Sequence, residues 1–87
     1  MFLTTETSIP QSHTVLRVIF GVGSIYEGSN KDAKASEAWR KIIGQALAEL
    51  EREGMQLGAD AVIGVQVSTS ETGAYLHATM IGTAVKF

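Results

Sequence analysis

The chain has 87 residues, of which 45% are hydrophobic and 18% charged, with seven Lys and Arg against nine Asp and Glu and a formal net charge of −2. This length accommodates one domain and excludes a second. The hydrophobic content excludes a disordered chain, and the absence of a basic excess argues against nucleic acid or an anionic membrane as partner. We therefore expect a single globular domain over residues 1–87.

A domain of this size needs reinforcement. It can bury only about 60% of its unfolded surface. The chain contains no cysteine, so neither a disulfide nor a thiolate zinc site can add stability. Association with further copies of the same chain remains, and we expect a homo-oligomer.

The amino-terminal residues 1–10 contain no Lys or Arg and lack the apolar stretch of a signal peptide. The longest apolar stretch, Val15–Gly23, is interrupted by Arg17 and is far shorter than the ~20 residues of a membrane-spanning helix. We therefore predict a cytoplasmic protein without membrane association.

A first strand is predicted at Thr14–Val22, which is rich in Val, Ile and Phe. One of its faces would carry Leu16, Val18, Phe20 and Val22, and the other Val15, Arg17 and Ile19. The glycines that follow do not form a nucleotide site. The segment from Gly23 to Gly28 lacks the Lys-Ser/Thr pair of a P-loop, and Tyr26 replaces the third glycine of a dinucleotide fingerprint. We interpret Gly21 and Gly23 as a turn or bulge.

A long helix is predicted from Asp32 to Leu57, where helix-forming residues dominate and proline is absent. Its apolar residues recur at helical spacing on one side. Ser29 or Asn30 would cap its start, and Gly58 would end it in a left-handed conformation. The apolar stripe comprises Trp39, Ile42, Ile43, Ala46, Leu47, Leu50, Gly54 and Leu57.

Two further strands follow, Ala59–Val67 and Ala74–Phe87, joined by a polar turn at Ser68–Gly73. The order β-α-β-β predicts an α+β, two-layer domain with a three-stranded antiparallel sheet and one long helix. If the last strand lies in the middle, the strand order is 1-3-2 and both outer strands are open edges. The helix covers one face, whereas Tyr75, Ile81, Val85, Val15 and Ile19 would lie on the other.

Three segments together resemble the YbjQ-like family of small bacterial proteins: Thr4-Thr5 with Thr7, the block Leu57–Val65 (LGADAVIGV), and Gly82–Lys86 (GTAVK). The resemblance covers nearly the whole chain. It implies a dodecin-like β-α-β-β fold assembled as a homopentamer or stacked pentamers, and a heavy-metal-binding function. The chain departs from the family in a shorter segment Gly23–Ala35 and in lacking the cysteine that some relatives carry at the end of the first strand.

Candidate chemistry is sparse. A transition-metal site needs three or four suitable ligands, whereas the chain offers His13, His77 and scattered acidic residues without a paired motif. A symmetric ring could still bring copies of His77 together. No nucleophile elbow or triad order is present, so we expect no enzymatic activity and assign neither catalytic nor metal-binding residues.

Trp39 is the one tryptophan. It could stack on a flavin, as aromatic residues do in dodecins, but its place in the helical stripe favours packing. The sequence leaves the cofactor unknown. The expected function is a homo-oligomeric, non-enzymatic YbjQ-like protein; the alternative is a dodecin-like carrier or storage assembly for a small aromatic ligand such as flavin.

Overall fold

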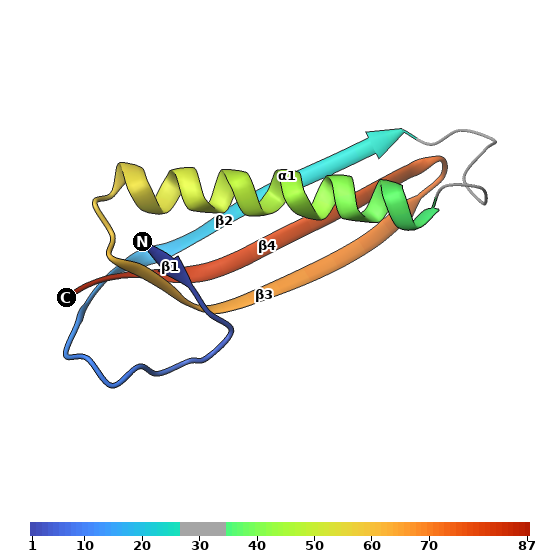
Figure 1. Cartoon of the computed structure of the whole chain (residues 1–87). Coiled ribbons are helices and arrows are strands. Elements are labelled where there is room, and N and C mark those ends of the chain that lie inside the picture. The colour runs from blue at the N-terminus through green and yellow to red at the C-terminus, as the bar shows by residue number, and fades with distance from the viewer. Residues whose placement is uncertain (27–34) are drawn as a thin grey trace.

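The structure, a computed structural model, describes residues 1–26 and 35–87. Its elements in chain order are β1 (Phe2–Leu3), β2 (Thr14–Tyr26), α1 (Ala35–Gln56), β3 (Ala61–Thr72) and β4 (Tyr75–Lys86). The helix lies against one face of a single sheet, so the domain has two layers (Figure 1). The α+β class and the two-layer arrangement agree with the sequence-based expectation.

The sheet is four-stranded and mixed, with the order β1-β3-β4-β2. Its last strand, β4, is central and pairs antiparallel with both β2 and β3, as the expected 1-3-2 order of the three long strands requires. The expectation of a three-stranded, purely antiparallel sheet is wrong, because β1 pairs in parallel with β3.

The extra strand is held by backbone hydrogen bonds. The Thr4 amide donates to the Val62 carbonyl (3.0 Å), and the Val65 amide donates to the Thr4 carbonyl (3.0 Å). Only two residues form β1, too few to display the alternation of apolar and polar residues by which a strand is found in a sequence. We therefore expected an open edge at β3, whereas in the structure β1 covers the start of that edge.

Two strands extend further than expected. β2 continues through Gly21 and Gly23 to Tyr26, and β3 continues to Thr72, so that the turn between β3 and β4 consists of Gly73 and Ala74 alone. The predicted turn at Ser68–Gly73 is thus wrong. Its Ser and Thr residues extend an exposed strand, to which threonine is well suited. Of the predicted helix, residues 32–34 lie outside the described residues, as do the proposed caps Ser29 and Asn30.

The end of α1 follows the prediction. Gly58 has φ +72°, a conformation that glycine adopts without steric cost. Its amide donates to the Met55 carbonyl, and the amide of Ala59 donates to the Gly54 carbonyl, both at 3.0 Å. This is the hydrogen-bond pattern of a Schellman motif. It turns the chain from the helix into β3.

The helix approaches β2 at two glycines that the sequence analysis had assigned to a turn or bulge. A methyl group on Gly21 would collide with the Ala46 carbonyl and lie 2.7 Å from the Leu50 amide nitrogen. One on Gly23 would collide with the Ile42 carbonyl. That interpretation is wrong because these glycines lie inside β2, where their lack of a side chain lets the backbones of helix and strand come together.

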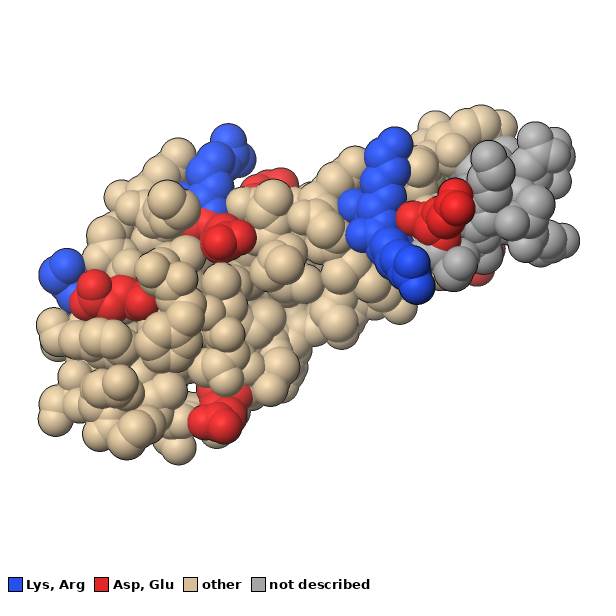
Figure 2. Space-filling view, viewed as in Figure 1, with Lys and Arg blue, Asp and Glu red and all other residues tan. Residues whose placement is uncertain are grey.

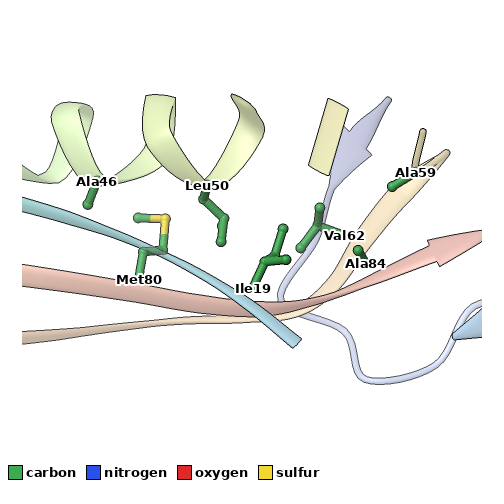
Figure 3. Packing of buried hydrophobic residues seen from close by; sticks show 7 residues of the cluster. All are labelled: Ile19, Ala46, Leu50, Ala59, Val62, Met80 and Ala84. Atoms are coloured by element: carbon green, nitrogen blue, oxygen red, sulfur yellow. The ribbon is translucent and has the colours of Figure 1, made fainter. Parts of the chain in front are cut away.

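The main core lies between α1 and the sheet. Figure 3 shows Leu50 descending from the helix toward Ile19 and Met80, which rise from the sheet. The cluster is completed by Ala46, Ala59, Val62 and Ala84. A second cluster, Ala38, Ile42, Leu76 and Ala78, continues the core along the helix. Leu76, Ala78, Met80, Gly82 and Ala84 thus share one face of β4, as predicted.

A bulge in β2 changes which residues face the helix. The pairing with β4 shifts between Val15 and Arg17. A bulge adds one residue to a strand and so reverses the alternation of its side chains beyond that point. Ile19 consequently lies in the core, only 3% exposed. Its predicted place on the uncovered face is wrong.

The face opposite the helix is covered at one end only. Ile9, from the segment between β1 and β2, packs on Ala61, Ile63 and Val85. Val85 is therefore buried, contrary to the expectation that it lies on an uncovered face. The rest of this face carries exposed side chains.

The molecule is elongated. Its extents are 49 × 21 × 17 Å and its radius of gyration is 14.7 Å, whereas a compact domain of this length has about 12 Å. No helix among residues 1–26 and 35–87 has the length and apolar character needed to span a membrane.

We predict that Gly21→Ala destabilises the fold by about 1–3 kcal/mol, because the added methyl meets backbone atoms of α1 that can move only with the helix. The matched control is Gly44→Ala, an exposed helical position with no atom within 4 Å of the added methyl, which should stabilise by about 0.5–1 kcal/mol. Urea unfolding at one fixed protein concentration measures both. Equal midpoints for the two variants would contradict this account of the helix–strand contact.

Candidate functional site

The two histidines lie far apart in the fold. His13 directly precedes β2, whose first residue, Thr14, pairs with Lys86, whereas His77 pairs with Ser24 ten residues further along. At about 3.3 Å per residue, more than 30 Å of strand separates them. The Nδ1 atom of His13 lies 2.9 Å from the Gln11 carbonyl oxygen. No metal site can use both histidines of one copy.

Among residues 1–26 and 35–87, no three His, Cys, Asp or Glu side chains gather closely enough to hold a metal ion. Histidine, cysteine and carboxylate side chains are the ligands of transition metals in proteins.

Trp39 packs in the core. Its half-buried side chain lies against the cluster of Ala38, Ile42, Leu76 and Ala78. This placement agrees with the packing interpretation of the helical stripe.

The three segments that carry the family resemblance meet at one end of the molecule. The Phe2 amide donates to the Asp60 carbonyl (3.3 Å), and the Asp60 amide donates to the Val85 carbonyl (2.8 Å). The Asp60 carboxylate accepts a hydrogen bond from the Phe87 amide (2.7 Å), and Lys86 donates to the Gly58 carbonyl (3.2 Å). The N-terminus, the block after the helix and the C-terminus are thus joined through Asp60.

These signature residues are structural. Besides Asp60, the block supplies the helix-ending Gly58 and the buried Val62. Its Gly64 amide donates to the Glu6 carbonyl at 2.7 Å, which holds the N-terminal segment against β3. The block therefore determines how the elements join, and it contributes no cluster of metal-binding or catalytic side chains.

Among the described residues, seven of the thirteen exposed large hydrophobic side chains lie on the sheet face opposite the helix. We call it the open face. It consists of seven side chains of β2 and β4, each between 44% and 64% exposed. The register between β2 and β4 shows that these side chains lie on the same side of the sheet, because Phe20 pairs with Ile81 and Tyr26 pairs with Tyr75. The seven are Val15, Val18, Phe20, Val22, Tyr26, Tyr75 and Ile81.

Three aromatic rings cluster at one end of the open face. The centroids of Tyr26 and Tyr75 lie 5.1 Å apart, and the ring of Tyr75 is stacked on that of His77 at 6.2 Å with 13° between the planes. Ser24 and Ser70 flank His77 in the sheet register. His77 therefore lies among aromatic and hydroxyl groups. Sequence reasoning missed this cluster because Tyr26 was assigned to a loop.

The described part of the helix side carries charged side chains and a hollow formed by the helix. Figure 2 shows basic and acidic side chains lying beside one another there, with uncharged surface between them. A hollow of about 440 Å³ on this side is lined by Ala48, Glu51, Arg52, Met55 and Gln56, all from the helix itself. Because one helix alone forms it, the hollow has no opposing wall to enclose a ligand.

A YbjQ family model, described as "Putative heavy-metal-binding", matches residues 11–87. The chain belongs to the YbjQ-like family. A "UPF0145 protein" of Trichodesmium erythraeum (strain IMS101) is 47% identical over 47 residues, which cover 48% of this chain and 44% of that protein. The chain thus spans less than half the length of this curated relative.

The fold of this YbjQ-like chain is also seen in a solved structure. A crystal structure from Pediococcus pentosaceus ATCC 25745, described as a protein with unknown function of the DUF74 family, superposes with a TM-score of 0.89 at 24% sequence identity. The match covers 100% of this chain and 97% of the other. At this identity the likeness shows the fold alone.

We predict that Asp60→Ala destabilises the fold by about 1 kcal/mol, because the Phe87 amide loses its charged acceptor. Glu6→Ala is the matched control, since it removes an exposed carboxylate while Glu6 joins β3 through its backbone. Urea unfolding measures the stability, and hydrogen exchange at Phe87 reports the local effect. Unchanged exchange at Phe87 in Asp60→Ala would refute the role of this carboxylate.

Proposed function

We propose that this YbjQ-like chain is the subunit of a non-enzymatic homo-oligomer, with five copies or a multiple of five, in which further copies cover the open face. The exposed apolar row on β2 and β4 is the observation that carries the proposal. Five is the number that the family resemblance implies.

The size of the open face supports this proposal. Aromatic side chains present ~150–250 Å² each, so Phe20, Tyr26 and Tyr75, each half or more exposed, leave roughly 250–450 Å² uncovered. The aliphatic side chains add to this area. The largest apolar patch of a typical monomer is about 300–600 Å², and one partner of a stable interface contributes about 800 Å². The open face thus reaches the size of the largest apolar patch of a typical monomer, a kind of patch that often marks an interaction site.

The shape of the subunit supports it as well. An elongated chain without disulfides buries little apolar surface for its length. Covering the open face removes its apolar surface from water, which stabilises by about 25 cal/mol for each Å². Assembly therefore adds buried apolar surface, and with it stability, to a subunit that buries little of such surface on its own.

A second function, a carrier for a small aromatic ligand such as flavin, is favoured by one observation. Tyr26, Tyr75 and His77 present neighbouring rings on the open face, and exposed rings can stack on a planar ligand. A species co-purifying with the protein in native mass spectrometry, and quenching of flavin fluorescence that depends on Tyr75, would favour this second function.

We predict that Phe20→Lys converts the oligomer to monomers. It places a charge at the centre of the open face, where assembly would desolvate it and bring like charges together. Met55→Lys is the matched control, because Met55 is 67% exposed on α1 and the substitution adds the same charge away from the sheet. Native mass spectrometry of untreated protein counts the subunits, and circular dichroism checks that each variant stays folded.

A monomeric natural protein would refute the proposed function. A second outcome would also contradict the proposal. If folded Phe20→Lys remains oligomeric while Met55→Lys becomes monomeric, the interface lies on the helix side and not on the open face.

Metal binding, the property named in the family's description, is expected to depend on His77. Only this histidine lies on the sheet beside the open face, where copies from several subunits can meet. We predict that zinc or copper binding by the oligomer is lost in His77→Ala and retained in His13→Ala, as measured by calorimetric titration. Retention in His77→Ala would contradict an intersubunit site at this residue.

A further inference from the structure

The segment between β1 and β2 lies on the side of the sheet that faces away from the helix. Figure 1 shows it leaving β1, looping out below the sheet and returning to the start of β2. We call residues 5–13 the strap. Its two ends are fixed, because β1 pairs with β3 before it and β2 pairs with β4 after it.

Few hydrogen bonds hold the strap on the sheet. Among the backbone hydrogen bonds of the described residues, one joins the strap to β3, where the Gly64 amide donates to the Glu6 carbonyl at 2.7 Å. The Glu6 amide donates to the Thr4 hydroxyl oxygen (3.2 Å), and the His13 ring contacts the Gln11 carbonyl. Neither of these two contacts reaches β2, β3 or β4.

A single aliphatic side chain anchors the strap. Ile9 is the one aliphatic residue among residues 5–13. It packs on Ala61 and Val85, which are 0% exposed, and on Ile63, which is 6% exposed. This cluster is separate from the two clusters beneath the helix. Lifting Ile9 from the sheet therefore leaves the core between helix and sheet in place.

A bulge in β3 leaves backbone amides free for the N-terminal segment. The register with β4 passes from Ile63 to Gln66, so that Gly64 and Val65 have no partner in β4. Gly64 has φ +63°, and unpaired residues are typical of a bulge. Their amides donate to the carbonyls of Glu6 and Thr4. Water can replace the strap as the acceptor for Gly64 when the strap lifts.

These contacts give the strap a low cost of opening. Segments with few buried apolar contacts and solvent-exposed hydrogen bonds open locally, whereas a core opens only when the whole domain unfolds. Opening the strap breaks the hydrogen bond from Gly64 to Glu6 and exposes Ile9 with the three side chains beneath it. The contacts of α1 with the sheet are not involved.

An open strap uncovers apolar surface that continues the open face. Val85 pairs with Val15, which is already 59% exposed, and Ala61 pairs with Val85. Directly paired residues of neighbouring strands carry their side chains on the same face of a sheet. Lifting the strap therefore joins Val85 and Ala61 to the open face at Val15.

We infer that the strap is a lid, which lifts from the sheet as a local unit while the domain stays folded and so controls the extent of the open face. With the strap closed, the open face ends at Val15. With the strap open, it continues across Val85 to Ala61. The inference goes beyond the proposed function, because the lid belongs to a single copy. A surface of this kind is present in a minor conformation that a partner contacting it makes dominant.

The test uses engineered cysteines in a chain that has none of its own. Val85→Cys places a thiol beneath Ile9, whereas Met80→Cys places one in the core beneath the helix. A thiol reagent reaches the first when the strap lifts and the second only when that core opens. Each cysteine variant is combined with Ile9→Ser, which removes the anchor. The matched control is Val15→Ser, which removes an apolar side chain that is already exposed.

We predict that Ile9→Ser accelerates labelling of Val85→Cys by about tenfold, because the closed strap loses the burial of one aliphatic side chain. Labelling of Met80→Cys should not change. Hydrogen exchange of the Gly64 amide, compared between the natural chain and Ile9→Ser, should accelerate by the same factor because it reports the same opening. Val15→Ser should alter neither measurement. Circular dichroism checks that each variant stays folded.

Three outcomes would overturn the inference. Equal acceleration at Val85→Cys and Met80→Cys would show that the strap opens only with the whole domain. Unchanged labelling and exchange in Ile9→Ser, or the same acceleration in Val15→Ser, would show that Ile9 does not hold a lid. Native mass spectrometry of the same samples reports the oligomeric state separately. A monomeric natural protein would refute the proposed function and leave the lid standing, whereas unchanged opening in an intact oligomer of Ile9→Ser would overturn the lid alone.

Discussion

The close contact between α1 and β2 determines the rest of the arrangement. Gly21 and Gly23 let the helix backbone lie directly on β2, which places the helix over β2 and β4 and leaves β3 with almost no helix contact. A single helix then covers one face of the sheet. Much of the opposite face stays exposed, and this is the surface on which the proposed assembly depends.

The residues that identify the family act on the same framework. Gly58 ends the helix, Val62 enters the core, and Asp60 joins the N-terminal and C-terminal segments to the start of β3. These roles explain why a chain can belong to the YbjQ-like family while its described residues bring together no group of metal ligands within one copy. The signature residues thus specify how the elements of the fold join.

The open face is the surface through which the proposed assembly forms. Phe20 and Ile81 pair across β2 and β4 on this face, so its apolar side chains come from two neighbouring strands. In the proposed oligomer, burial of these side chains supplies a non-directional attraction between copies.

Composition and periodicity alone determined the α+β class and the long helix with its stop at Gly58, because these follow from local propensity and from patterns repeated over many residues. The central position of the last strand was only assumed at that stage, and the pairing of β4 with β2 and β3 decided it. Other features depend on contacts between distant residues. The strand at Phe2–Leu3 exists through backbone bonds to β3, the bulge near Arg17 moves Ile19 into the core, and the glycines of β2 meet the helix backbone. The ring cluster of Tyr26, Tyr75 and His77 likewise arises from strand register. Tertiary structure decided these features, because a backbone contact or a one-residue shift leaves no periodic signal in the sequence.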